Sequence, residues 1–215
     1  MNGKKIADMR KDYGIRALDL ESVDPNPLKQ FELWFLEAYK SEGEEANAFT
    51  LATIGLDGFP GARIVLLKLY AEDGFSFFTN YNSLKAKELD AHPVASMTFH
   101  WRSLERQVRI RGSVSKLDPI LSDEYYSSRP RESQIGAWAS PQSERISGRD
   151  QLNEKYEFYA EKFEGNNHIP RPPYWGGYQL KPNRIEFWQG RPNRLHDRIL
   201  FELKNDQWVT SRMAP

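Results

Sequence analysis

The segment Arg194-Leu195-His196-Asp197-Arg198, near the C-terminus, carries the side chains best suited to chemistry in this sequence. Leu195, Ile199, Phe201 and Leu203 fall on one parity of the chain, which predicts a half-buried strand from Arg194 to Leu203. On such a strand Arg194, His196 and Arg198 share the other face, with neighbours about 7 Å apart. Positive or titratable groups this close repel one another, so the pattern favours an anionic or electron-rich ligand above them. A solvated polar face is the alternative.

Two further clusters lie in the first half of the chain. The segment Arg63–Lys68 places a cation at each end of an apolar run, although strict alternation puts the two cations on opposite faces. A bulge or curvature is needed for both to reach one ligand, and the alternative is two side chains that extend into water. The segment Thr79–Lys85 leads into a predicted helix, whose free N–H groups can bind phosphate. Lys85 opposes the helix dipole there unless an anion is present, but ordinary capping remains possible.

Two more clusters follow along the chain. Gln107, Arg109 and Arg111 share one face of a predicted strand, where Gln107 can hydrogen-bond a ring carbonyl or ring nitrogen. A solvated outer face explains the same pattern. Tyr, Arg and Ser residues surround a helix end in the segment 125–134, and arginine is the preferred bidentate phosphate ligand. The alternative is a cation at a helix C-terminus followed by a loop. Together the clusters indicate one or two small phosphorylated ligands.

The elements that must position these side chains follow from periodicity, caps and turn residues. Helices are predicted at 27–40, 83–91, 119–127 and 149–163, with a turn at 134–139. Strands are predicted at 49–54, 62–70, 75–79, 94–101, 107–117, 178–189, 194–203 and 208–210. Antiparallel strands in this number tend to close into a barrel, which removes exposed edges. We expect a mobile arm over residues 1–24 and a single mainly β domain over residues 25–215.

Composition limits the function classes. The sequence has 215 residues and a formal net charge of +0, so nothing global attracts nucleic acid or an anionic membrane. It has no cysteine, which excludes thiol chemistry and fits a cytoplasmic protein, and a redox reaction would need a bound organic cofactor. The 4 histidines have no metal-ligand spacing, so no metal site is expected. No signal peptide or membrane span is predicted.

The clusters resemble, in order and at compatible spacing, the motifs of the pyridoxamine 5'-phosphate oxidase family. The matching segments are RIVLLK (63–68), LERQV (104–108), SRPRESQIGAW (128–138), QSERIS (142–147), IEFWQG (185–190), RLHDR (194–198) and the terminal RMAP, with Arg10 and Tyr13 in the arm. The resemblance implies an antiparallel FMN-binding split β-barrel and a homodimer with active sites at the subunit interface. It implies oxidation of pyridoxamine or pyridoxine 5'-phosphate by O2 to pyridoxal 5'-phosphate, with release of hydrogen peroxide.

The resemblance also implies roles for individual residues. Arg194 and His196 would be catalytic, over the substrate ring. The residues implied to line FMN are Arg63, Ile64, Val65, Leu66, Leu67, Lys68, Phe78, Thr79, Lys85, Gln107, Gln142, Ser143, Trp188 and Arg198. The residues implied to bind substrate are Arg10, Tyr13, Lys68, Tyr125, Arg129, Ser133, Arg194, Leu195 and His196. Within these sets Arg10 and Tyr13 would close the site as a lid.

Two residues depart from the family pattern on the FMN side. Leu84 occupies a position where relatives usually have arginine, and Phe78 one where tyrosine is common. Other functions compatible with the sequence are a related split-barrel flavin reductase and a non-catalytic carrier of FMN or pyridoxal phosphate. Anaerobic mixing with pyridoxamine 5'-phosphate separates enzyme from carrier, because only an enzyme bleaches the flavin.

Overall fold

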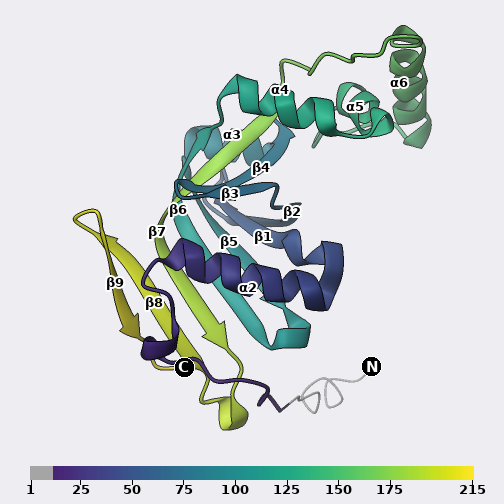
Figure 1. The fold of residues 1–215 in the computed structure, drawn as a ribbon. Helices are drawn as coiled ribbons and strands as arrows, with labels where there is room; N and C mark the ends of the chain where they lie inside the picture. Colours follow the sequence, from purple (N-terminus) through teal and green to yellow (C-terminus); the bar gives the residue numbers. More distant parts are fainter. Residues whose placement is uncertain (1–11) are drawn as a thin grey trace, which may run out of the picture. The chain divides into compact units, whose positions relative to one another are not determined.

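The computed structural model describes residues 12–215 and consists mainly of one antiparallel sheet with helices (Figure 1). The hydrogen-bonded strand order is β2-β1-β5-β6-β7-β4-β3, and β8 pairs with β7 and β9. The strands are β1 (Ala48–Ile54), β2 (Pro60–Leu66), β3 (Leu69–Ala71), β4 (Gly74–Asn80), β5 (Val94–Trp101), β6 (Arg106–Lys116), β7 (Trp175–Gln189), β8 (Asp197–Lys204) and β9 (Gln207–Arg212).

The helices lie between the strands in sequence. The α-helices are α2 (Pro27–Glu42), α3 (Leu84–Ala91), α4 (Pro119–Ser128), α5 (Arg131–Ala139) and α6 (Arg149–Lys162). Short 3-10 turns are η1 (Leu20–Ser22), η2 (Gly43–Asn47), η3 (Arg102–Leu104) and η4 (Pro192–Arg194). No helix in the described part of the chain is both long and apolar enough to cross a bilayer.

Local sequence signals explain where the helices begin. The Asn26 side chain accepts a hydrogen bond from the Leu28 N–H at 2.9 Å, and Pro27 occupies the first helical position of α2. Asp118 caps α4 in the same way, through the Ile120 N–H at 2.8 Å. Both helices start where cap and proline predict.

The chain forms two compact units, and β1, β5, β6 and β7 contribute residues to both. Unit 1 comprises the described residues up to Phe49, together with Met97–Arg111 and Pro182–Pro215. Unit 2 comprises Thr50–Ser96 and Gly112–Lys181. Strand β7 pairs with β4 through Trp175–Leu180, inside unit 2, and with β8 through Arg184–Gln189, inside unit 1.

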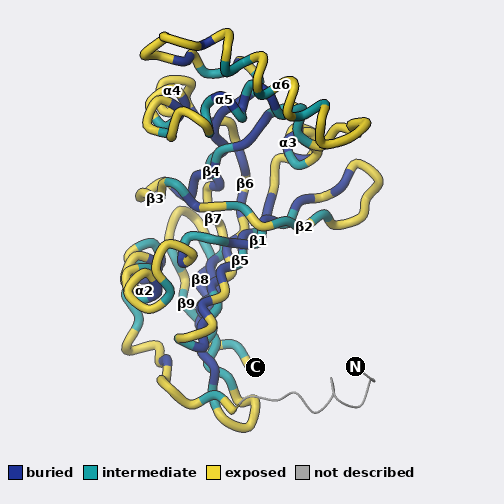
Figure 2. Tube along the Cα trace, turned by 90° about the vertical axis from the view of Figure 1, so that its right-hand side faces the viewer, coloured by how far each residue is buried: buried dark blue, intermediate teal, exposed yellow. Residues whose placement is uncertain are grey.

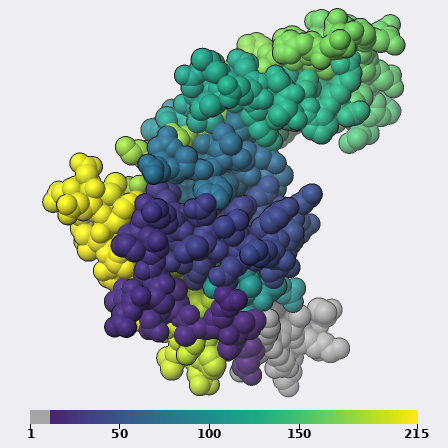
Figure 3. Space-filling model, in the orientation of Figure 1, coloured from purple at the N-terminus to yellow at the C-terminus, as the bar shows by residue number. Residues whose placement is uncertain are grey.

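The core of unit 1 lies where α2 packs against aromatic residues of the strands. Phe31 and Trp34 project from α2 and are almost fully buried. The Phe31 ring lies 5.2 Å from that of Phe99, and the Trp34 ring lies 5.1 Å from that of Phe187. Turn η1 packs against β9, where purple and yellow surfaces adjoin in Figure 3. This core anchors the first described residues to the C-terminal hairpin.

Unit 2 buries a second aromatic cluster. Tyr126, Ile135, Phe163, Ile169 and Trp175 form its buried part, drawn from α4, α5, the end of α6 and β7. Helix α6 itself has no buried residue and is coloured as exposed and intermediate in Figure 2. The α6 helix therefore covers this cluster from outside.

Three sequence expectations need correction. The sheet does not close into a barrel through hydrogen bonds over residues 12–215. The predicted strand at 62–70 is broken between β2 and β3 at Leu67 and Lys68, because the Lys68 N–H bonds to the Ser76 carbonyl. The predicted turn at 134–139 is part of helix α5.

A fourth correction concerns the predicted strand from Arg194 to Leu203. Arg194 and His196 do not lie on a strand, because β8 begins at Asp197. Asn193 and Arg194 both have left-handed backbone angles, with φ of 57° and 62°, which strand geometry does not allow. Leu195 is 69% exposed rather than buried. Arg194, Leu195 and His196 therefore lie in the connection between β7 and β8.

Candidate functional site

The start of α3 brings together three of the expected cofactor residues. The Lys85 ammonium donates to the Gln142 side-chain oxygen at 2.8 Å and to the Thr79 hydroxyl at 3.0 Å. The Thr79 hydroxyl donates to the same Gln142 oxygen at 3.0 Å. Ser143 follows in the exposed loop with φ of 71°. The convergence of β4, α3 and this loop creates a polar cluster with one cation.

Burial changes the protonation of this cation. Desolvation, with a smaller contribution from the nearby Arg63 charge, lowers the pKa of Lys85 to about 8, while Glu88 opposes the shift. A bound anion would remove part of this penalty, because an opposite charge favours the protonated amine. The cluster therefore has the electrostatics of an anion site.

Arg63, the second expected cation here, is engaged by protein groups. Its guanidinium donates to the Glu88 carboxylate at 2.9 Å and also bonds the Thr53 hydroxyl. Glu88 is 3% exposed, so this ion pair is largely shielded from water. Arg63 thus contributes a compensated charge, and Lys85 is the cation that the cluster can offer to a ligand.

The expected flavin-lining segment after Arg63 shows mixed exposure. Ile64 and Leu66 are 67% and 44% exposed, and Val65 is partly buried. Leu67 is buried at 4% exposure. The Lys68 ammonium lies 6.0 Å from the centre of the Tyr125 ring. Because the strand is broken at Leu67 and Lys68, the side chain of Lys68 does not have to follow the alternation of faces that begins at Arg63.

A stack of aromatic rings forms beside this lysine. The Phe78 ring lies 4.0 Å from that of Tyr125 and 5.5 Å from that of Trp175, and the rings are nearly parallel. The guanidinium of Arg129 lies 4.7 Å from the centre of the Trp175 ring. Helix α4, strand β4 and the start of β7 thus build one wall from Tyr125, Phe78, Trp175 and Arg129.

A cavity of about 250 Å³ opens next to this wall. Its lining residues are Asn80, Arg129, Ser133, Gly136, Ala137, Ser140, Gln142 and Trp175. The Arg129 Nη1 atom is buried without a hydrogen-bond partner, and burial lowers the pKa of this guanidinium. A buried guanidinium nitrogen without an acceptor is costly, so this donor fits an anionic oxygen bound in the cavity.

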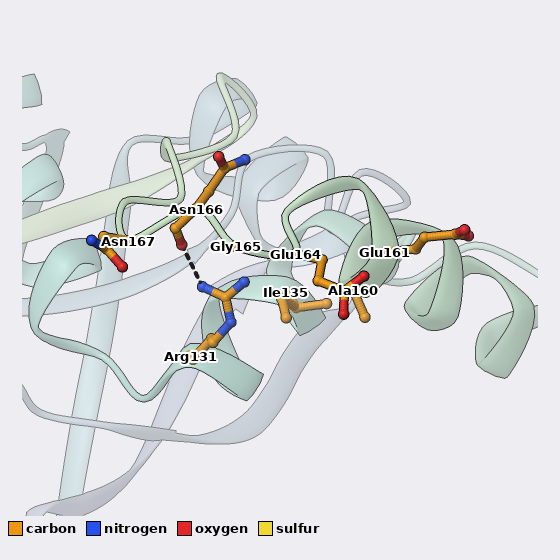
Figure 4. Close-up of a pocket in the computed structure, with 8 residues that line it drawn as sticks. All are labelled: Arg131, Ile135, Ala160, Glu161, Glu164, Gly165, Asn166 and Asn167. Atoms are coloured by element: carbon orange, nitrogen blue, oxygen red, sulfur yellow. Dashed lines mark hydrogen bonds between the residues drawn. The ribbon is translucent and has the colours of Figure 1, made fainter.

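Arg131, two residues after Arg129, has a structural role. Arg131 donates to the Asn166 carbonyl at 2.8 Å (Figure 4). It also donates to the Phe163 carbonyl at 2.5 Å, just beyond α6. It borders a separate cavity of about 580 Å³ together with Ile135 and Glu164. Arg131 therefore stabilises the end of α6. Arg129, two residues earlier, differs because its Nη1 is buried without a hydrogen-bond partner.

Unit 1 brings together three further expected residues. The imidazole of His196 lies 4.6 Å from the Trp188 ring and 5.8 Å from that of Tyr13, measured between centroids. His196 Nδ1 accepts a hydrogen bond from the Arg191 N–H at 3.1 Å, so Nε2 is the atom left to face a ligand. Arg194 is exposed beside it.

Arg198 differs from Arg194 and His196 in its surroundings. It pairs with Trp188 across β7 and β8, and its guanidinium donates to both Glu186 oxygens at 2.8 and 3.1 Å. This hydrogen bonding raises the pKa of Arg198. Glu186 also lies 3.5 Å from Arg109, and Gln107 is partly buried on the same strand as Arg109. Arg198 is therefore a compensated cation, unlike the freely exposed Arg194.

Comparison with known proteins accounts for this arrangement. Residues 35–158 match the sequence family described as "Pyridoxamine 5'-phosphate oxidase". Residues 175–215 match the family described as "Pyridoxine 5'-phosphate oxidase C-terminal dimerisation region". The chain belongs to the pyridoxamine 5'-phosphate oxidase family.

Individual relatives agree with this assignment. The pyridoxine/pyridoxamine 5'-phosphate oxidase of Cyanothece sp. is 52% identical over 210 residues, which cover 98% of both chains. The enzyme named pyridoxine/pyridoxamine 5'-phosphate oxidase 1 in Ralstonia nicotianae is 54% identical over 211 residues, with 98% and 99% coverage. A solved structure of PhzG from Burkholderia lata 383, in complex with tetrahydrophenazine-1-carboxylic acid, has a TM-score of 0.87 at 26% identity. It covers 94% of this chain and 100% of that chain.

Membership of the pyridoxamine 5'-phosphate oxidase family brings FMN as cofactor. The donors in unit 2 fit its phosphate, because Lys85 and the Thr79 hydroxyl converge where the first turn of α3 has free N–H groups. The unpartnered Arg129 Nη1 fits a second anion. Arg10 lies outside the described residues, and these contain no group of side chains able to hold a metal ion.

Sequence reasoning missed Trp175 and Asn80 as parts of the cavity wall. Trp175 precedes two glycines, and a Cβ on Gly176 would lie 2.2 Å from the Tyr81 hydroxyl. Adjacent glycines in a strand indicate close packing, and this signal was available in the sequence. Asn80 donates to the Ser140 carbonyl at 3.3 Å, a long-range contact that no local pattern reveals.

Proposed function

We propose that this chain oxidises pyridoxamine 5'-phosphate and pyridoxine 5'-phosphate to pyridoxal 5'-phosphate. The alcohol loses two electrons and two protons to O2, which becomes hydrogen peroxide. The amine also loses two electrons and two protons, which gives an imine. Water then hydrolyses the imine to the aldehyde and ammonia. When bound, FMN supplies the two-electron chemistry that connects substrate and O2. The observation that carries the proposal is the vacant donor of Arg129 in the unit 2 cavity.

In this proposal, the residues of unit 2 hold phosphate groups. Lys85, Thr79 and Gln142 bind the FMN phosphate, with Ser143 beside them and Arg63 adding charge. Arg129 donates its free Nη1 to the substrate phosphate, supported by Ser133, Tyr125 and Lys68. The segment Ile64–Leu67 and Phe78 border the flavin.

The residues of unit 1 act on the rings. His196 and Arg194 are proposed as the catalytic residues, since one offers Nε2 and the other an exposed guanidinium. Cationic donors at this position stabilise negative charge that develops on the pyridine system during oxidation. Trp188, Gln107 and Arg198 border the flavin, and Tyr13, Arg10 and Leu195 border the substrate.

We further propose a homodimer with its active sites at the subunit interface, as the matched dimerisation region supports. The cytoplasmic location expected from composition stays part of the proposal, and cell fractionation tests it.

The decisive experiment mixes the FMN-loaded protein with pyridoxamine 5'-phosphate without oxygen, and then admits O2. We expect the flavin absorbance to bleach and then recover, with pyridoxal 5'-phosphate and hydrogen peroxide formed in equal amounts. A carrier would leave the flavin oxidised throughout. A flavin reductase of another specificity would bleach with a nicotinamide donor and ignore the phosphorylated amine.

Replacement of Arg194 tests the catalytic assignment. Arg194→Ala should lower kcat/KM by about ten- to a hundredfold, the value of one charged hydrogen bond. The melting temperature should hardly change, because Arg194 is exposed. Arg102→Ala, at another exposed position of unit 1, is the comparison and should leave kcat/KM unchanged. Loss of stability with unchanged kcat/KM would show that Arg194 is structural.

A further inference from the structure

Backbone groups of the segment 13–19 form hydrogen bonds to side chains elsewhere in unit 1. The carboxylate of Glu105 accepts hydrogen bonds from the N–H groups of Gly14 at 2.8 Å and Ile15 at 3.2 Å. Glu105 lies between η3 and β6 with φ of 55°, and it is 3% exposed. Burial of a carboxylate is costly unless N–H groups bond to it. The docked segment supplies those groups, so its docking and the burial of Glu105 depend on each other.

Further contacts continue along the same segment. The Leu18 N–H donates to the Asp197 carboxylate at 3.0 Å, and the Leu18 carbonyl accepts from Arg212 at 3.0 Å. The Arg16 carbonyl accepts from Arg191 at 3.2 Å. Side chains of the segment contribute as well, because Arg16 pairs with Glu37, Asp19 pairs with Arg212, and Leu18 is buried. Main-chain and side-chain contacts together hold the segment in a fixed register.

A glycine leaves room for the tyrosine at the start of this segment. The Gly190 N–H donates to the Glu105 carbonyl at 2.7 Å. A Cβ on Gly190 would lie 2.8 Å from Tyr13 Cγ and 2.9 Å from Tyr13 Cβ, closer than real Cβ atoms approach. Tyr13 in turn lies edge-on to Trp188 and His196, with both centroid distances 5.8 Å. Glu105 and Gly190 together determine where the Tyr13 ring lies.

We propose that Glu105 is a positioning residue, which docks residues 13–15 so that Tyr13 covers His196. Glu105 acts through its hydrogen bonds to the backbone of Gly14 and Ile15, and the proposal requires no contact between Glu105 and substrate. Gly190 supports it by leaving space for the Tyr13 ring. The effect of Glu105 on substrate rests on the proposed function. The docking of residues 13–15 does not depend on that function. Glu105 therefore controls how well the site retains substrate.

Kinetics and proteolysis test this inference on the FMN-loaded protein. Glu105→Ala should raise the KM for pyridoxamine 5'-phosphate by about ten- to a hundredfold, with kcat and FMN affinity changed by less than about threefold. Trypsin should cut after Arg16 at least about tenfold faster, measured by mass spectrometry, because the docked bond is no longer held. Glu105→Gln keeps an oxygen acceptor and should restore most of both properties. Glu44→Ala removes the same charge from an exposed position in unit 1 and should change neither.

A second variant guards against simple misfolding of Glu105→Ala. Gly190→Ala adds one methyl group against Tyr13 Cβ and Cγ and should reproduce both effects. It should add little in a Tyr13→Gly background, which removes both of these atoms. Unchanged cleavage after Arg16 in Glu105→Ala and Gly190→Ala would overturn the docking role. Faster cleavage with an unchanged KM would overturn the positioning role. If the wild-type chain does not oxidise the substrate, the proposed function fails, while the cleavage rates still decide the docking.

Discussion

Burial of Lys85 makes the protonation of this residue sensitive to a bound anion. Its pKa is lowered to about 8 from 10.5, so the folded protein releases this proton more readily than the unfolded chain. The free energy of unfolding of the FMN-free protein therefore rises with pH between these two values. A phosphate bound beside Lys85 would raise its pKa again. FMN affinity should thus change little between about pH 7 and pH 8, where the phosphate is fully deprotonated and Lys85 largely protonated, and it should fall above pH 8.

The expected size of this effect follows from the linkage of one proton. Between about pH 8 and pH 9 the affinity for FMN should fall by up to about fivefold, because Lys85 is already half deprotonated at pH 8, and fluorescence titration measures this. Lys85→Met should bind FMN more weakly at every pH and show a flat profile over that range. The same steep profile in Lys85→Met would show that another group titrates.

Leu84 lies where the sequence resemblance leads us to expect an arginine in relatives. It is 50% exposed at the first position of α3, so a longer side chain can be accommodated without disturbing the core. Leu84→Arg should tighten FMN binding by about ten- to a hundredfold, since it adds one charge-assisted contact. The gain should be largest at low salt, where screening is weakest. Leu84→Gln controls for polarity, and equal or weaker binding by Leu84→Arg would end this hypothesis.

At this scale the sequence predicted residue types better than it predicted their positions. Thr79, Lys85 and Gln142 do converge, and Tyr13, Trp188 and His196 do as well. The argument that first singled out His196 was nevertheless wrong, because it required a strand. Alternation of residue types cannot reveal the positive φ of Asn193 and Arg194 that ends the strand pattern. The charges that compensate Arg63 and Arg198 come from Glu88 and Glu186, which are 25 and 12 residues away and carry no local signal.

Among the elements, those with explicit start signals were predicted best. Helices α2 and α4 begin at the proline after a capping side chain, and β5 has the predicted bounds. Helix α5 was predicted only as a turn, because its Pro130 cap makes no side-chain hydrogen bond. The break between β2 and β3 depends on a bond to Ser76, which a pattern within the segment cannot contain.

The β3–β4 turn offers a test at the scale of elements. Gly74 has φ of 144°, and a Cβ there would lie 2.2 Å from the Leu180 carbonyl oxygen on β7. Gly74→Ala should lower the free energy of unfolding by about 2–4 kcal/mol, from backbone strain and overlap together. Gly58→Ala in the β1–β2 turn is the matched control, because it has positive φ but no atom within 4 Å. It should cost only about 1 kcal/mol. Equal losses in urea unfolding would show that the contact with Leu180 does not matter.

For the whole molecule, the proposed dimer makes a direct prediction. Residues 175–215 match a dimerisation region, and they contain Trp188, Arg194 and His196. Sedimentation of the FMN-loaded protein should give twice the chain mass of 25.0 kDa at concentrations that support activity. Activity should fall with the dimer on dilution, because a homodimer's function depends on protomer concentration. A fully active monomer would contradict the prediction.

The discontinuous make-up of unit 1 has a consequence for synthesis of the protein. Unit 2 ends at Lys181, so all its residues have been translated while Pro182–Pro215 is still to come. Unit 1 needs that last segment, which includes β8, β9 and the partners of Leu18. Domains generally fold as units during translation. On the ribosome, unit 2 with its proposed phosphate-binding side chains should therefore fold first. The docked segment of unit 1 and the residues proposed to contact the rings would follow only after Pro182–Pro215 has been synthesised.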